Sequence, residues 1–343
     1  MSISKTPSPC HVSRRAADRK QVLRLGGESA VDEYHFLLLP EFSFIGFAAL
    51  MEPFRIANRF QPGASRWRLL SVDGQAVAAS NGIALMVDGA LAEAGPCTCL
   101  FVVSSFHPLR HYTPELGAAL RRLERGGMTL GAIDTGCFIL AEAGLLRGET
   151  VTLHWEAIPA FRERYPQVTA SQELFLTERR PTSAGAAAGL DLALALLARR
   201  HGRELALAVS EQLVQGQMRS PSEHQRLQVA SRYQVHNKKL AQAIRLMEEQ
   251  LEEPWPPEEL AARCGATRRQ LERLFRAHLK ASPAEFYRAL RLDRARWLLR
   301  QTELSVVEIS VVCGFESPSY FSRAYRKRFD RSPREDREDR SGA

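Results

Sequence analysis

Two segments in the last third of the chain carry arginines and small polar residues at matching positions. The Cys-Gly pair at 264–265 recurs at 313–314, and a shift of 50 residues then aligns Arg273 with Arg323 and Phe275 with Tyr325. Arginine can donate two hydrogen bonds to a guanine edge, and neighbouring cations can hold phosphates. The duplication therefore predicts two similar units that contact double-stranded DNA.

Each unit has the pattern of helix, turn and helix. Gly265 and Gly314 fit the turn, because glycine accepts the positive φ that often follows a helix. Thr267 has the residue type of an N-cap in a capping box, and Ser317 before a proline is a second N-cap. The expected core faces of the second helices are Leu271, Leu274, Phe275 and Leu279, and Phe321, Tyr325 and Phe329.

The other face of each second helix is expected to reach DNA. Residues near the helix N-terminus would read base edges, and later cations would hold phosphates. The alternative is that these charges only solvate exposed helix faces, but two matched copies disfavour it. The predicted DNA-binding residues are Arg268, Arg269, Gln270, Arg273, Arg276, Ser317, Ser319, Ser322, Arg323 and Arg326.

This region resembles the DNA-binding module of AraC/XylS transcription regulators. The resemblance rests on Gly314-Phe315, the run 317–323, Tyr325-Arg326, Phe329 and Ser332-Pro333. It implies a DNA-binding domain at 238–340, activation rather than repression, and RNA polymerase as a further partner. The sequence departs from the family pattern at Asp330, where glycine is usual, and at Asp336. We expect the tail from 334 onward to be a solvated mixture of charges.

Short apolar runs alternate with helical stretches between residues 34 and 215. This alternation predicts an α/β sandwich, a parallel sheet with helices on both faces, followed by the all-α region with its two helix-turn-helix motifs. The expected strands are 35–39, 67–72, 99–103, 128–133, 151–155 and 173–177, and the expected helices are 47–59, 114–125, 138–146, 184–200 and 203–215. Residues 1–33 are expected to be a flexible tail, 34–215 a front domain, and 216–237 a linker.

Asp134 lies where a strand is expected to end and a helix to begin, which is the arrangement of a nucleophile elbow. The segment 130–138 resembles the PfpI-type, class I glutamine-amidotransferase-like fold, whose catalytic members place cysteine at this elbow. Together with motifs at 37–40, 52–58, 152–156 and 182–185, it resembles GlxA-type regulators, in which this domain precedes an AraC/XylS module.

An enzyme would need a reactive thiolate beside a histidine. Cys137 falls inside the expected helix, pointing away from the strand ends, and His154 is the candidate general base. We therefore expect no enzyme activity. A hydrolase or amidotransferase with an accessory DNA-binding tail stays open as the alternative.

The carboxyl ends of parallel strands form a crevice that can bind a small molecule, and its aromatic and acidic residues would suit a cation. The predicted ligand-binding residues are Phe44, Ser104, Ser105, Phe106, Asp134, Thr135, Gly136, His154, Trp155 and Glu156. The resemblance implies an effector such as arginine, glycine betaine or carnitine, and a homodimer formed through this domain. Two alternatives stay open. The aromatic residues could belong to the core with Asp134 capping the helix, or the front domain could only dimerise.

Composition bounds the class of protein. The 343 residues carry a net charge of +8, and residues 238–343 hold 22 Lys and Arg against 17 Asp and Glu. The most apolar stretch, 184–198, is too short to cross a bilayer and contains Asp191. Six scattered cysteines and no secretory segment indicate reduced thiols in a cytoplasmic protein, with no metal and no cofactor.

Overall fold

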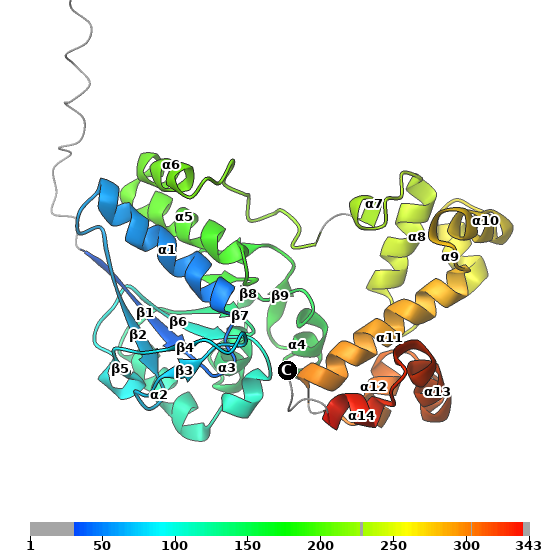
Figure 1. Ribbon diagram of the computed structural model, residues 1–343, viewed down its shortest axis with the longest axis horizontal. Coiled ribbons are helices and arrows are strands. Elements are labelled where there is room, and N and C mark those ends of the chain that lie inside the picture. Colours follow the sequence, from blue (N-terminus) through cyan, green and yellow to red (C-terminus); the bar gives the residue numbers. More distant parts are fainter. Residues whose placement is uncertain (1–30, 227–228, 303, 339–343) are drawn as a thin grey trace, which may run out of the picture. The chain divides into compact units, whose positions relative to one another are not determined.

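The computed structural model describes residues 31–226, 229–302 and 304–338 (Figure 1). Residues 1–30 of the expected tail, residues 227–228 of the expected linker and residues 339–340 of the expected DNA-binding domain lie outside this description. None of the helices in the described ranges is long and apolar enough to cross a membrane.

A seven-stranded sheet forms the centre of the front domain. Its strand order is β10-β11-β7-β6-β1-β2-β5, and every neighbouring pair is parallel except β10 with β11. The central strands are nearly continuous apolar runs because both of their faces are covered. The strand bounds are β1 Asp32–Leu38, β2 Ser65–Ser71, β5 Gly89–Ala90, β6 Cys99–Ser104, β7 Leu130–Asp134, β10 Phe175–Leu176 and β11 Thr182–Ser183.

Helices cover both faces of this sheet (Figure 1). Alternate strand residues point to opposite faces, so Phe36 joins the core beneath one set of helices and Leu37 the core beneath the other. The predicted α/β sandwich is confirmed. The first set is α1 (Phe44–Phe60), α5 (Ala188–His201) and α6 (Arg203–Gln212), and the second is α2 (Pro114–Arg125) and α3 (Gly136–Glu142), with the short helices η1 (Leu91–Glu93) and η2 (Pro108–His111) in connections.

Two predicted strands were wrong in extent or partner. The strand expected at 151–155 is β8 (Thr150–Thr152), which pairs with β9 (Thr169–Ser171) outside the main sheet. At Thr152 the backbone N–H donates to the Thr182 hydroxyl (3.0 Å), and the Thr152 hydroxyl donates to the Glu173 carbonyl (2.5 Å), so side-chain hydrogen bonds replace the strand ladder. The strand expected at 173–177 shrinks to the antiparallel edge strand β10.

Several short elements have no signal in the sequence. Most are two or three residues long, and a segment of that length contains no hydrophobic period. These elements are β3 (Val77–Ala78), β4 (Ala84–Leu85), β5, β9, β11 and the seven-residue helix α4 (Ile158–Arg164).

The described residues after 228 are all helical or connecting. Capping boxes begin α10, α11 and α12, and the box predicted at Thr267 is confirmed, because its hydroxyl accepts from the Gln270 N–H at 3.2 Å. The helix bounds are α7 Val229–Arg232, α8 Lys238–Glu249, α9 Pro257–Arg263, α10 Arg268–Leu279, α11 Pro283–Gln301, α12 Val306–Val312, α13 Pro318–Phe329 and α14 Pro333–Glu338.

The long helix α11 joins the two helix-turn-helix units. Tyr287 near its start belongs to the core of the first unit, and Ala295 and Leu298 near its end belong to the core of the second. A hydrogen bond also joins α11 to the turn of the second unit: the Arg291 guanidinium donates to the Gly314 carbonyl at 2.7 Å. One continuous helix therefore sets the spacing of the two turns.

Gly265 and Gly314 occupy equivalent turns but have different surroundings. Both have positive φ, 60° and 69° respectively. A Cβ added at Gly314 would lie 2.4 Å from the Glu252 carbonyl oxygen, whereas one at Gly265 would have no heavy atom within 4 Å. The second glycine is needed for close packing as well as for its backbone conformation.

Alanine at these two positions should separate the two effects. We expect Gly265→Ala to lower the free energy of unfolding by about 1 kcal/mol, the ordinary cost of a left-handed alanine. Gly314→Ala should cost about 3 kcal/mol or more, because Glu252 must also move. Urea unfolding of the full chain followed by circular dichroism measures both, and equal losses would contradict the packing role of Gly314.

Candidate ligand crevice and nucleic-acid interface

Backbone strain is concentrated at the carboxyl ends of the parallel strands. Among the described residues, eight non-glycine residues have positive φ, and four of them lie at or just after the ends of β1, β6, β7 and β11. These are Glu41, His107, Asp134 and Ala186. Each costs about 1–3 kcal/mol, and such strain persists mainly where a site requires it. The strain falls at the edge where the ligand crevice is predicted.

Asp134 occupies a cramped elbow between β7 and α3. Its φ is 58°, and its side chain is buried. A Cβ on Gly136 would lie 2.2 Å from the Val102 carbonyl oxygen, and a Cβ on Gly185 would lie 2.8 Å from the Asp134 Cβ. Thr135 is the N-cap of α3 and no side chain caps that helix, so the alternative that Asp134 is a helix cap is wrong.

The Asp134 carboxyl has a pKa near neutral pH. Its pKa is raised from the ordinary value of 3.8 to about 7, mainly by burial and also by the negative charge of Glu156. The Ser105 hydroxyl and the Thr135 N–H oppose these effects by stabilising the carboxylate. A nearby cation would stabilise the ionised form, so the carboxyl group is suited to pairing with a positive ligand.

Polar groups from neighbouring strand ends surround Asp134. Ser104 is opposite Asp134 in the β6–β7 register, and its buried hydroxyl has no hydrogen-bond partner among the described residues. The Thr135 hydroxyl donates to the Ser105 carbonyl at 2.5 Å, which ties the two strand ends together. The structure thus brings Ser104, Ser105, Asp134 and Thr135 together at these strand ends. Glu156, which was also predicted from the sequence, acts on Asp134 through its charge.

The aromatic residues and His154 have different environments. Phe106 is 44% exposed, Trp155 is half-buried, and Phe44 begins α1 with its ring packed partly against the core. His154 Nδ1 lies 3.8 Å from the Glu156 carboxylate, and burial lowers the histidine pKa. Because Phe106 is exposed, the alternative that it is a core residue is wrong.

The sequence analysis missed one contact made by a residue of the predicted crevice, Trp155. The Arg226 guanidinium carbon lies 4.0 Å from the centroid of the Trp155 ring. Arg226 belongs to the segment expected to be a linker, where a single arginine in a polar stretch gives no signal of such a contact.

Cys137 is unsuited to nucleophilic chemistry. Its side chain is fully buried, and its Sγ lies 3.4 Å from the Thr152 carbonyl oxygen, to which the thiol donates. Burial and the nearby Asp134 raise the pKa of this thiol. A neutral buried thiol is a poor nucleophile.

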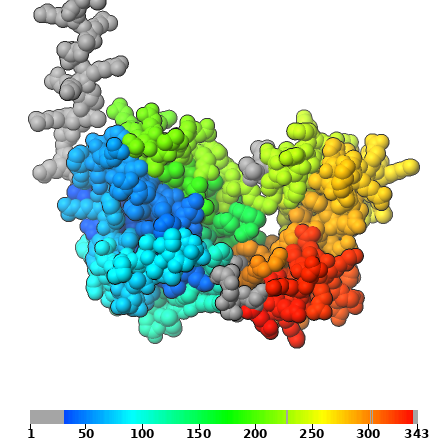
Figure 2. Space-filling view, in the orientation of Figure 1, coloured from blue at the N-terminus to red at the C-terminus, as the bar shows by residue number. Residues whose placement is uncertain are grey.

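The second helices of the two units are equivalent in burial. Residues 271–280 and 321–330 have the same order of buried, half-buried and exposed positions. Leu271, Phe275, Phe321 and Tyr325 are buried, and the flanking arginines project outward. Figure 2 shows the segments coloured gold near residue 270 and red near residue 325 at the molecular surface.

The predicted DNA-binding residues differ in whether they already form ion pairs within the protein. No ion pair engages Arg269, Arg273 or Arg323 among the residues that the structure describes, and all three are exposed. Arg268 instead pairs with Glu258 (2.7 Å) and Glu272 (3.0 Å).

Other members of the predicted set also have local partners. Arg326 lies 3.6 Å from Glu335, and Arg276 acts on the charge of Glu285. Gln270 Oε1 and the Ser317 hydroxyl both cap helices, Ser322 is half-buried and Ser319 is exposed. Tyr320, which is 42% exposed in the first turn of α13, was not among the predicted residues.

The end of the helical region corrects the expectation of a solvated tail. Asp336 is buried, accepts a 2.5 Å hydrogen bond from Tyr325, and pairs with Arg296 (2.9 Å) and Arg300 (2.6 Å). Although burial opposes ionisation, these partners hold the pKa of Asp336 below its usual range. Asp336, the residue that departs from the family pattern, therefore holds α13 against α11.

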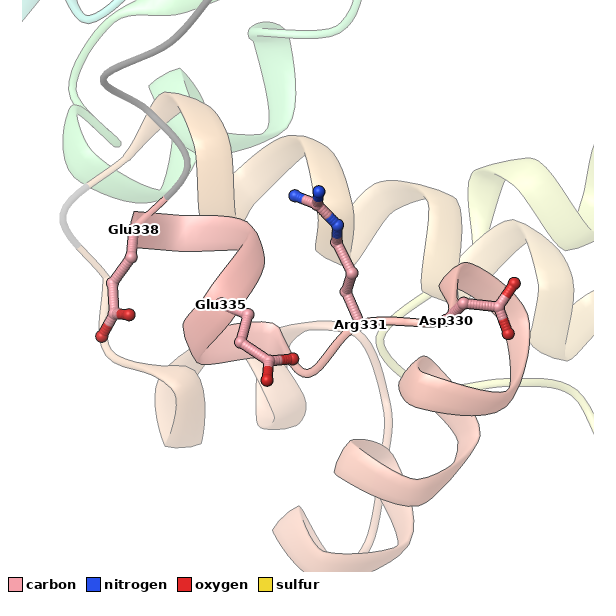
Figure 3. A pocket seen from close by; sticks show the side chains of 4 residues that line it. All are labelled: Asp330, Arg331, Glu335 and Glu338. Carbon is pink, nitrogen blue, oxygen red and sulfur yellow. The ribbon is translucent and has the colours of Figure 1, made fainter.

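A surface hollow lies where α13 turns into α14 (Figure 3). Its lining side chains are Asp330, Arg331, Glu335 and Glu338. Asp330 has φ 57°, which explains why glycine is usual at this place in the family. Three carboxylates against one guanidinium do not favour a phosphate, so this hollow is not part of the DNA interface.

Comparison with known proteins covers both regions. The chain matches the DJ-1/PfpI family at residues 41–199 and a helix-turn-helix domain at residues 260–339. It is 56% identical to the HTH-type transcriptional regulator CdhR of Pseudomonas aeruginosa, over 89% of this chain and 91% of that one. Identity to the HTH-type transcriptional regulator ArgR of the same species is 41%, over 90% and 93% of the two chains. Identity to the HTH-type transcriptional regulator GlxA of Rhizobium meliloti is 33%, over 93% and 96%.

The raised pKa of Asp134 predicts how stability depends on pH. Since the folded-state pKa exceeds the unfolded value, ionisation costs stability as pH rises from about 4 to about 7. Asparagine tolerates positive φ and cannot ionise. Asp134→Asn should therefore raise the unfolding free energy relative to the wild type by about 2 to 4 kcal/mol at pH 8.5, and much less at pH 4.5.

Urea unfolding at both pH values measures this difference. Asp330→Asn, a change at an exposed aspartate with the same left-handed backbone conformation, is the matched control. If the difference in unfolding free energy between the wild type and Asp134→Asn is the same at pH 4.5 and pH 8.5, the ionised carboxylate is not destabilised by its surroundings.

Proposed function

Because the chain belongs to the family of HTH-type transcriptional regulators that join a DJ-1/PfpI domain to an AraC-type helix-turn-helix domain, we propose that it is a ligand-responsive, sequence-specific regulator of transcription. The resemblance predicted from the sequence is confirmed, and the helix-turn-helix domain makes DNA a partner. The proposed division is a ligand-sensing and dimerising domain at 34–215, a linker at 216–237 and a DNA-binding domain at 238–340.

The matched outer faces of α10 and α13 carry the DNA-binding part of this proposal. Both helices bury an aromatic ring on the inner side and expose an arginine at the equivalent outer position, Arg273 and Arg323. Two such helices that enter one face of B-DNA would lie about one helical turn, ~34 Å, apart. We propose that α11 sets this distance.

The polar and acidic groups around Asp134 support the proposed response to a ligand. A carboxyl that ionises near neutral pH, a second carboxylate on Glu156 and the half-buried ring of Trp155 suit an amine, guanidinium or quaternary ammonium group. We propose an effector of the arginine, glycine betaine or carnitine type, and regulation of the metabolism of such compounds.

The remaining parts of the proposal follow from the family. We propose an activator that acts in the cytoplasm as a homodimer and contacts RNA polymerase. We propose no catalytic role for the front domain, because aspartate occupies the elbow and the thiol of Cys137 is buried.

Removal of the exposed arginines tests DNA binding. Arg273→Ala and Arg323→Ala should each weaken binding to a duplex selected from a random library by about 1–3 kcal/mol and relax sequence preference. Arg66→Ala, the same change of charge on the exposed side of β2, should leave affinity unchanged. Fluorescence anisotropy at several salt concentrations measures affinity. Equal losses on every sequence would assign phosphate contacts instead of base contacts, and unchanged affinity would contradict the interface.

The pKa of Asp134 predicts how effector binding depends on pH. A cation binds the ionised carboxylate, so affinity should fall about tenfold between pH 8 and pH 6, below the pKa of about 7. Calorimetric titration with L-arginine and glycine betaine measures this. Asp134→Asn should weaken binding and remove the pH dependence, whereas Glu211→Gln on the exposed side of α6 should change neither. Absence of binding by every amine tested would favour a front domain that only dimerises.

A further inference from the structure

The segment before the C-terminal helical region is fixed to the front domain by several hydrogen bonds. The Gln225 side-chain amide donates to the Leu153 carbonyl (3.1 Å) and the Glu173 carbonyl (2.9 Å), and it lies 3.1 Å from the Thr152 hydroxyl. A backbone hydrogen bond from Leu174 to Pro221 (3.0 Å) extends the contact. The chain is therefore held beside the turn that carries Trp155.

An ion pair fixes the same segment further upstream. Arg219 donates two hydrogen bonds to the buried carboxylate of Asp191, at 3.0 and 2.6 Å. A buried carboxylate paired in this way would be costly to leave alone. Residues 219–225 consequently deliver the next residue, Arg226, to a defined place.

Arg226 lies on the aromatic face that we assign to the effector. Its guanidinium is 4.0 Å from the Trp155 ring centroid, within the range of a cation–π interaction, and its side chain is 34% exposed. Glu248 of α8 lies 3.7 Å from the Arg226 guanidinium and is its main negative partner. The charge of Glu156 acts on Arg226 more weakly, and it also acts on Asp134. Trp155 and Glu156 thus already receive a guanidinium that comes from the chain itself.

We propose that Arg226 is a tethered occupant of the cation subsite on Trp155, which an effector with a guanidinium or ammonium group must displace. This inference rests on the proposed function of the crevice. It identifies the chemical class of the effector from the group that the subsite already holds. It also names the residue through which effector binding reaches the linker.

Displacement of Arg226 would couple the crevice to the DNA-binding domain. Arg226 directly precedes the segment that leads into α7, which begins at Val229. When the guanidinium leaves Trp155, one attachment between the linker and the front domain is lost. Because coupling is reciprocal, whatever draws Arg226 away from Trp155 must also raise effector affinity.

The full chain can be tested by changing Arg226 and titrating with known cations. Arg226→Gln removes the internal cation and should make L-arginine or glycine betaine bind about 3- to 30-fold more tightly by calorimetry. Arg226→Lys keeps a cation and should bind close to wild type. Arg66→Gln makes the same change of charge on β2 and should equal wild type.

The outcomes separate this inference from the proposed function. If the wild type binds a probe and Asp134→Asn weakens it, but Arg226→Gln binds no more tightly, the crevice is an effector site and the tethered occupant is wrong. If neither probe binds the wild type or Arg226→Gln, both the effector site and its occupant are contradicted for these cations. Tighter binding by Arg226→Gln and Arg66→Gln alike would also overturn the proposal, because a general change of net charge would then explain it.

Discussion

Burial of one face on each of two helices is the constraint on which the proposed DNA interface depends. Leu271 and Phe275 on α10, and Phe321 and Tyr325 on α13, are fixed in apolar cores. Since the helical period is 3.6 residues, fixing these side chains inward turns the arginines between them outward. The hydrogen bond and ion pairs of Asp336 reinforce α13 in this orientation. The direction of the cationic side chains is therefore a consequence of packing.

The front domain has a different constraint, the crowding at the carboxyl edge of its sheet. Close backbone approach at Gly136 holds α3 against β6, and the left-handed conformation of Asp134 follows from the sharp turn between β7 and α3. In related catalytic proteins such an elbow presents a nucleophile. With aspartate in that position, the same geometry leaves a buried acid whose ionisation responds to charge nearby.

The two constraints meet in the linker. Gln225 and Arg219 hold it against the front domain through buried polar partners, and Arg226 contacts the aromatic ring next to Glu156. A transcription regulator of this kind needs a difference in free energy between ligand-bound and ligand-free states. In our proposal, competition between Arg226 and an external cation for the Trp155 ring would provide such a difference without a large rearrangement of the core.

Much of this could be predicted from residue order alone, because helix caps, turn glycines and alternating apolar runs act over a few residues. The capping box at Thr267, the paired turns and the parallel sheet were predicted for this reason. The short strands, the clamp on Asp336, the pKa of Asp134 and the contact of Arg226 with Trp155 were not. Each depends on groups brought together from distant parts of the chain, such as residues 155 and 226. A local pattern of hydrophobic residues cannot indicate such a contact. The sequence determined which surfaces carry charge, and tertiary packing decided which of those charges are paired, buried or available.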